Sequence, residues 1–297
     1  MADYARRRSL KIAGIFLLPA LVVLFVTTIF PLLYSFNLSF RQFNLAKPFI
    51  PRIFVGLQNY KTLLQDNGFY HSLFVTFKVM VVAISVEFVL GFALALLLTQ
   101  KLRGMGFIRT LFMIPMMMSS IVVSLIWLFL YFPGMGYLNY FLNFLHVADV
   151  PWITGENVAL YSIALVDIWQ WTPFVMLGIA AGLQSLPQEP LEAAMVDGNS
   201  RLQVLTHLTI PQLKPILASL FFLRAIDCFK IYDVIFVLTK GGPGDSTESL
   251  SFYIYREGFT LWQMGFGAAA SFVALIIMTV LITLFIRTIK EEEPRAA

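Results

Sequence analysis

Six long apolar stretches dominate this sequence, and each is long enough to cross a membrane as a helix. About 20 apolar residues are needed to cross the roughly 30 Å of hydrocarbon in a bilayer. The stretches lie at about 12–34, 72–99, 109–132, 158–183, 216–239 and 263–287. Only 13% of the residues are charged, whereas a soluble domain typically carries about 25%. The sequence therefore predicts an all-α polytopic membrane protein with six transmembrane helices in a single domain, residues 1–297.

An even number of spans puts both termini on one side, and lysine and arginine indicate which side that is. Loops on the cytoplasmic side carry an excess of these residues. One side collects twelve of them: Arg6, Arg7, Arg8, Lys11, Lys101, Arg103, Arg109, Arg201, Lys214, Arg287, Lys290 and Arg295. The other side collects five, or six with Lys240 at a boundary: Arg41, Lys47, Arg52, Lys61 and Arg256. We therefore expect both termini in the cytoplasm. The first stretch is too long for the apolar region of a signal peptide and lacks a cleavage site, so we interpret it as a retained span.

Four charged residues of alternating sign interrupt the stretch at 216–239. Arg224, Asp227, Lys230 and Asp233 recur every three residues. Residues three apart are neighbours on a helix, so Asp227 can pair with both Arg224 and Lys230. Each ionic side chain costs roughly 2.5–3.5 kcal/mol at the bilayer centre, so this stripe should face protein or water. It is either part of a translocation pathway or a charge ladder that helps helices pack, and the spacing fits both.

The second stretch also contains ionisable residues. Lys78 and Glu87 are nine residues apart, so they point to opposite sides of a helix and cannot pair with each other. The stem of Lys78 can carry its charge towards water, whereas Glu87 is expected to face another helix.

The fourth stretch contains a polar and aromatic patch that comprises Asp167, Trp169, Gln170, Trp171 and Pro173. Sugar rings stack on indoles, and their hydroxyl groups need hydrogen-bond donors and acceptors. The patch therefore suits a sugar, although an aromatic belt at the membrane interface explains it equally well.

The connection at 184–215 is unusually long and polar, and it lies on the expected cytoplasmic side. Pro187 and Pro190 fit the first turn of a helix. Gly198 is placed to end that helix in the left-handed conformation. These signals predict a short helix that stops at a glycine turn.

A second helix is predicted directly after that turn. Ser200 and Gln203 have the spacing of a capping box, and the helix should cover about 201–209 before it runs into Pro211. Such a hinged pair of helices could dock a soluble protein, or it could be an amphipathic loop that lies on the membrane.

This segment resembles the EAA loop of binding-protein-dependent ABC importers. The loop's pattern is Glu-Ala-Ala, three residues, Gly, and later Ile-x-Leu-Pro. The matching residues here are Glu192, Ala193, Ala194, Gly198 and Pro211, with Asp197 before the glycine as in the sugar branch. Leu208 and Ile210 stand where Ile and Leu are usual, and Asn199 replaces a usual Ala. These departures are mild.

Two further elements resemble carbohydrate permeases. Residues 54–60, FVGLQNY, are similar to the Gly-Leu-x-Asn-Tyr element that follows the first span in that family. Residues 224–233, RAIDCFKIYD, with the LTKGGPG at 238–244, are similar to the fifth-span element of maltose-type and glycerol-phosphate-type permeases. The resemblance covers nearly the whole chain, which lacks the large extracytoplasmic insertion and extra N-terminal spans of the larger members.

The resemblance implies the type I ABC importer permease fold and a role in uptake of a sugar or sugar-like solute by alternating access. In that family the helix before the glycine inserts into a cytoplasmic ATPase. The coupling residues implied are Glu192, Ala193, Ala194, Asp197, Gly198 and Pro211. The candidates for the translocation pathway are Trp169, Gln170, Trp171, Arg224, Asp227, Lys230 and Asp233.

The same resemblance implies the partners and the location. The partners are a homologous second permease subunit, a dimer of cytoplasmic ATP-binding subunits, an extracytoplasmic solute-binding protein and membrane lipid, but not nucleic acid. The location is the inner membrane of a bacterial or archaeal cell, as a multi-pass protein.

Other activities are disfavoured by what the sequence lacks. It has no Gly-x-x-x-x-Gly-Lys-Ser/Thr phosphate loop, so the chain is not expected to hydrolyse ATP. Its single cysteine, Cys228, excludes an internal disulfide and a cysteine-based metal cluster, and no cofactor or metal is expected. A secondary transporter could use the charges of the fifth stretch but would not need the loop. An intramembrane enzyme would have only His71, His146 and His207 and no serine nucleophile elbow.

Overall fold

The computed structural model describes residues 16–47, 49, 52–99 and 104–292, which form helices and one small sheet. Several residues of the charge analysis lie outside this part of the chain: Arg6, Arg7, Arg8, Lys11, Lys101, Arg103 and Arg295. The described residues separate into two compact units: those of 16–66 together with 254–275, and those of 67–253 together with 276–292. The interpretation of the chain as one permease domain that contains the 184–215 loop stays a prediction.

The first unit begins with the predicted first span, which is helical over Phe16–Ser39. A π-helical turn, η1 (Phe25–Ile29), precedes α2 (Phe30–Ser39), whose first turn contains Pro31. Proline has no N–H, so a helix must rearrange its hydrogen bonds around it, and the π turn directly before Pro31 is such a rearrangement. The chain then forms an antiparallel pair, β1 (Arg41–Gln42) and β2 (Ile53–Phe54), followed by α3 (Gln58–Leu63).

The Gly-Leu-x-Asn-Tyr element fastens α3 to the end of the first span. Gly56 has a φ of 58°, a conformation that favours glycine. The Asn59 side-chain amide donates to the carbonyl oxygens of Ser39 and Arg41 at 2.8 and 3.0 Å. The Tyr60 hydroxyl lies 2.7 Å from the Ser39 hydroxyl. The unit is completed by η3 (Arg256–Thr260) and the first part of α14 (Met264–Glu292).

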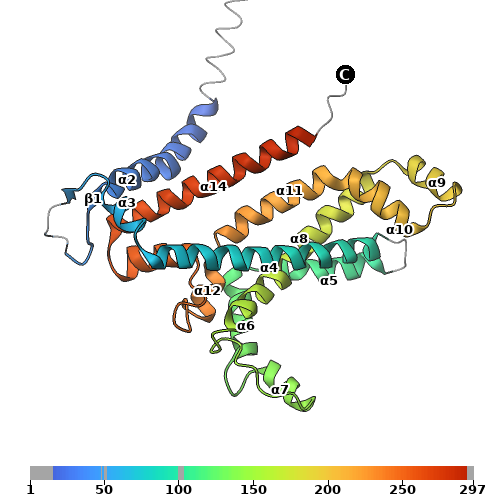
Figure 1. Cartoon of the computed structure of the whole chain (residues 1–297), viewed down its shortest axis with the longest axis horizontal. Coiled ribbons are helices and arrows are strands. Elements are labelled where there is room, and N and C mark those ends of the chain that lie inside the picture. Colours follow the sequence, from blue (N-terminus) through green and yellow to red (C-terminus); the bar gives the residue numbers. More distant parts are fainter. Residues whose placement is uncertain (1–15, 48, 50–51, 100–103, 293–297) are drawn as a thin grey trace, which may run out of the picture. The chain divides into compact units, whose positions relative to one another are not determined.

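The second unit is built on three packed helices, α4, α8 and α11 (Figure 1). Its elements in chain order are α4 (Asn67–Leu98), α5 (Met105–Met117), α6 (Ser120–Tyr131), α7 (Tyr137–Phe144), α8 (Ala159–Ser185), α9 (Gln188–Val196), α10 (Arg201–Val204), η2 (Leu205–Thr209), α11 (Ile210–Phe229), α12 (Asp233–Leu238), most of α13 (Leu250–Tyr255) and the end of α14. Small residues let the helices approach closely. A Cβ atom at Gly178 would clash with the side chain of Leu220 of α11, and one at Gly91 would lie 2.9 Å from Val175.

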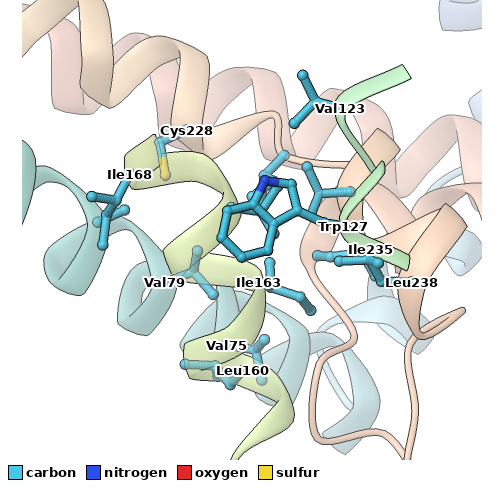
Figure 2. Close-up of a cluster of buried hydrophobic side chains, with 14 of the residues drawn as sticks. Val75, Val79, Val123, Trp127, Leu160, Ile163, Ile168, Cys228, Ile235 and Leu238 are labelled. Carbon is cyan, nitrogen blue, oxygen red and sulfur yellow. The ribbon is translucent and has the colours of Figure 1, made fainter. Parts of the chain in front are cut away.

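An apolar core fills the space between α4, α6, α8 and α12. Figure 2 shows Trp127 of α6 at its centre, with Val79 of α4, Ile163 of α8 and Ile235 of α12 around it. All of these are buried except for a small part of the indole. This core explains why α12, a helix of only six residues, has a fixed place.

Two of the predicted spans are interrupted. The stretch at 109–132 forms α5 and α6, which are bent by 96°. Pro115 weakens the end of α5, and Met118 and Ser119 are extended, with ψ of 148° and 140°. By length and apolar composition, four helices of the described chain could cross a membrane, or five if this bent pair is one span.

The predicted continuous helix over 216–239 is wrong. α11 ends at Phe229, Lys230 leaves the helical conformation, and α12 begins at Asp233. The alternating charges fit this break, because a cation is favourable at a helix C-terminus and an anion at an N-terminus. Six crossings with both termini in the cytoplasm therefore stay a prediction.

Candidate coupling loop and polar pocket

The glycine turn of the 184–215 loop forms as the sequence predicts. α9 begins directly after Pro187, and Gly198 has a φ of 85°. The backbone N–H of Gly198 donates to the Met195 carbonyl at 3.2 Å. Both the backbone N–H and the side-chain amide of Asn199 donate to the Ala194 carbonyl, at 3.1 and 3.0 Å. Asn199 therefore satisfies a carbonyl at the end of α9, a role that alanine could not fill through its side chain.

The capping box is also confirmed. The Ser200 N–H donates to Gln203 Oε1 at 2.7 Å, and the Gln203 N–H donates to Ser200 Oγ at 3.3 Å. The predicted end of this helix at Pro211 is wrong, because α10 continues through η2 into α11. The N–H of Ile210 bonds to the Leu205 carbonyl, five residues back, and this π turn precedes Pro211 in the first turn of α11. A widened turn of this kind accommodates a proline without ending the helix.

Most of α9 is exposed. Ala194 is the one buried residue of this fully described helix. The expected coupling residues Glu192, Ala193 and Asp197 are all exposed. At the tip, Val196 is 87% exposed. The loop therefore presents a fixed helix with apolar side chains that nothing in the described chain covers.

A second polar site lies inside the packed helices and is centred on Arg224 of α11, whose side chain is 1% exposed. Its Nε and Nη2 donate to the two oxygens of Glu87 on α4, at 2.7 and 2.8 Å. Nη2 also donates to Asp167 Oδ2 on α8 at 2.6 Å, and Nη1 donates to Asp227 Oδ2 at 2.7 Å. The guanidinium carbon lies 5.0 Å from the centre of the Trp171 ring, a cation–π contact. One cation thus joins three helices through three carboxylates.

This arrangement settles several expectations. The pairing of Arg224 with Asp227 is confirmed, and Glu87 faces another helix as predicted. The pairing of Asp227 with Lys230 is wrong, since Lys230 forms no ion pair with any described residue. Lys230 follows the last residue of α11, so it no longer shares a helical face with Asp227.

A polar pocket of about 190 Å³ lies beside the cluster. It is bounded by α8, the start of α6 and the break between α11 and α12. Its lining includes Ser120, Asp167, Gln170, Trp171, Asp227, Lys230, Tyr232 and Asp233. The amide of Gln170 donates to the Met118 carbonyl at 3.2 Å and approaches the Ser120 hydroxyl at 3.5 Å. The bend between α5 and α6 therefore supplies the groups that orient Gln170.

The pathway candidates divide between two places. Gln170, Trp171, Asp227, Lys230 and Asp233 line the pocket, and Arg224 is buried beneath it, bonded to Asp227. Trp169 lies elsewhere, with its ring 5.9 Å from that of Trp127 and in an apolar hollow. Residues two apart on a helix point in different directions, so the two indoles of α8 do not form one platform.

The polar site residues that were not among the pathway candidates are Glu87, Ser120, Asp167 and Tyr232. The cost of a carboxylate within an apolar stretch was a usable signal for Glu87, because a partner on another helix can offset that cost. Ser120 gave no comparable signal, since its place in the pocket follows from the bend before α6.

Comparison with known proteins places the chain in a family. Residues 87–291 match the family described as binding-protein-dependent transport system inner membrane component. A probable ABC transporter permease protein of Sinorhizobium fredii, y4oQ, is 38% identical over 92% of this chain and 89% of that protein. The trehalose/maltose transport system permease protein MalF of Thermococcus litoralis is 36% identical over 91% of each.

A solved structure supports the fold. The crystal structure of a bacterial ABC transporter that imports the acidic polysaccharide alginate contains a chain with a TM-score of 0.84 and 19% identity. The match covers 99% of this chain and 100% of that one. The chain therefore belongs to the binding-protein-dependent transport system inner membrane components: it is a multi-pass permease subunit with the type I importer fold, not an ATP-hydrolysing subunit.

Proposed function

We propose that this chain is one of two homologous permease subunits of an ATP-driven importer in the inner membrane. It takes up a sugar or sugar-like solute that an extracytoplasmic binding protein delivers. A dimer of cytoplasmic ATP-binding subunits docks on the 184–215 loop, and the chain crosses the membrane six times with both termini in the cytoplasm. The relative named for trehalose and maltose transport supports the sugar class.

The observation that carries the proposal is the exposed, rigid α9. The Asn199 amide, the left-handed Gly198 and the Ser200–Gln203 box fix its position, yet Val196 at its tip is almost fully exposed. A loop that merely lay on the membrane would not need such a fixed turn. A helix that docks into a groove on a soluble partner needs a fixed orientation and buries its exposed apolar side chains there. α9 has both features.

Substitution of Gly198 tests the coupling role. A φ of 85° is impossible for proline, so Gly198→Pro should abolish uptake and binding-protein-stimulated ATPase activity while the chain still inserts. Gly198→Ala should reduce both partially, since a left-handed alanine costs roughly 1–2 kcal/mol.

Gly106→Ala is the matched control. A Cβ atom at either glycine would have no neighbour within 4 Å, but only Gly198 has a positive φ. Gly106→Ala should therefore transport normally. Normal coupled uptake by Gly198→Pro would show that the loop does not transmit the energy of ATP.

We also propose that the polar pocket is this subunit's part of the translocation pathway. Its carboxylates and the Gln170 amide offer groups that sugar hydroxyls can bond to, and Lys230 and Tyr232 can donate. The pathway residues are Gln170, Trp171, Asp227, Lys230 and Asp233, with Arg224 holding Asp227 in place. Trp169 would act on the pathway only through its packing against α6.

The contribution of Asp227 can be compared with that of an aspartate outside the pocket. Asp227→Ala should reduce uptake more than it reduces assembly, because the side chain lines the pocket and is bonded to Arg224 but is also partly solvated. Asp245→Ala should have little effect, because the side chain of Asp245 is 63% exposed. Uptake by the complete transporter and the amount of assembled complex are the measurements. Equal and mild effects would contradict the pathway assignment.

A further inference from the structure

The short segment that follows the first span exposes apolar side chains and lysines together. Ile53 and Phe54 of β2 are 53% and 68% exposed, and Leu57 before α3 is 67% exposed. Lys61 is four residues after Leu57, and Lys47 lies in the connection between the strands; both are exposed. Neither ammonium group forms an ion pair with a residue that the structure describes. We call these five residues the ribbon surface.

The geometry of the chain holds the ribbon surface at the level of the lipid headgroups. The first span has 24 residues, which as a helix reach about 36 Å, slightly more than the roughly 30 Å of hydrocarbon. Ser39 at its end is therefore at the membrane surface when this helix crosses the bilayer as the sequence predicts. The Asn59 side chain bonds to the carbonyls of Ser39 and Arg41, so α3 cannot move away from that level.

The charges of the segment are predominantly positive. Residues 40–66 contain four basic residues, Arg41, Lys47, Arg52 and Lys61, and one acidic residue, Asp66. The two arginines are used internally. Arg41 donates to the Asn37 side chain at 2.9 Å, and Arg52 lies 4.5 Å from the centre of the Phe43 ring. The two lysines are left to reach outward on long apolar stems.

Both faces of β2 are exposed, and this favours lipid over a docking protein as the partner. Neighbouring residues of a strand point to opposite faces, and Ile53 and Phe54 are each more than half exposed. A docking protein covers one face of a ribbon, whereas a lipid layer surrounds it. The ribbon surface also continues the apolar surface of the first span, in which the most apolar 18-residue window has no buried residue.

We propose that β2 and α3 lie in the headgroup layer of the leaflet from which they emerge. Ile53, Phe54 and Leu57 enter the outer hydrocarbon, and Lys47 and Lys61 bind the phosphates of anionic phospholipid. This combination of apolar and basic side chains is typical of interfacial elements. The segment would anchor the first span at a fixed depth.

Spin labels on the full-length chain in lipid nanodiscs test the depth. Labels at Phe54→Cys and Leu57→Cys should be more accessible to oxygen than to a water-soluble nickel complex. A label at Val196→Cys on α9, which is 87% exposed, should show the opposite pattern. Cys228 is buried, so it should not compete for the label. The proposal fails if the labels at 54 and 57 are more accessible to the nickel complex, like the one at 196. If a solute-binding protein then protects them, the surface is a docking site for that protein.

The lysines can be tested for binding to anionic lipid. The chain is placed in nanodiscs of phosphatidylcholine with increasing amounts of phosphatidylglycerol. Its affinity for phosphatidylglycerol should fall about fivefold for each of the substitutions Lys47→Gln and Lys61→Gln. Retention of phosphatidylglycerol in native mass spectrometry measures this binding. Lys240→Gln, which removes another exposed lysine without an ion pair to the described residues, is the matched control. Unchanged binding in the double variant, or the same loss in Lys240→Gln, would overturn the assignment of these two lysines.

Discussion

Arg224→Met should destabilise the fold by about 3–5 kcal/mol, the cost of removing one partner of a buried ion pair. The guanidinium makes four hydrogen bonds to three carboxylates. Without it, Glu87 at 0% exposure and Asp167 at 5% would be left as buried, unpaired anions. Asp227 should add little to the loss, because its side chain is 48% exposed and water can solvate it.

Equilibrium unfolding of the purified chain in mixed micelles with sodium dodecyl sulfate measures this loss. Lys78→Met is the matched control: its ammonium lies 5.4 Å from the centre of the Tyr161 ring, an exposed contact that contributes about 0.5–1 kcal/mol. The triple variant Glu87→Gln, Asp167→Asn, Arg224→Met should regain most of the stability, because no unpaired charge remains buried. The electrostatic reasoning is refuted if Arg224→Met costs no more than Lys78→Met, or if the triple variant is no more stable than the single one.

Two other substitutions test a close backbone contact and a helix cap. Gly265→Ala should lower the thermal midpoint by an amount equivalent to about 1–3 kcal/mol, because its Cβ would clash with the Arg41 carbonyl oxygen. An unchanged midpoint would mean that the backbone shifts to make room. Ser200→Ala removes the cap of α10 and should lower the stability of that helix by about 1 kcal/mol. The amides at 201–204 should then exchange hydrogen faster. Equal protection of these amides in both proteins would show that the cap does not hold this turn.

Features encoded by neighbouring residues could be predicted from the sequence. The Gly198 turn and the Ser200–Gln203 box each depend on residues within one helical turn, and both formed as expected. Local patterns also identified Glu87 as facing another helix. They could not name its partner, because Arg224 is 137 residues further along the chain and only the packing of α4 on α11 brings them together.

Hydropathy could not predict the breaks in the helices. An apolar stretch has the same mean hydropathy whether it forms one helix or two. The bend at Met118 and the gap at 230–232 could therefore not be located from hydropathy. Tertiary contacts decide both: Ile231 and Ile235 are buried in the apolar core, and Gln170 bonds to the Met118 carbonyl that the bend exposes. The pocket depends on these two breaks, so its lining could be predicted only in part.

The order of the charged residues along the chain has a consequence for biogenesis. Glu87 and Asp167 both precede Arg224, so when α11 leaves the ribosome its counter-charges are already synthesised on α4 and α8. An arginine helix entering lipid alone would bear the full cost of its charge, whereas one that enters beside two waiting carboxylates exchanges water for salt bridges in a single step. In the proposed topology with six crossings, the insertion of α11 should therefore depend on the earlier helices, and a chain that has lost Glu87 and Asp167 should stall with α11 at the membrane surface.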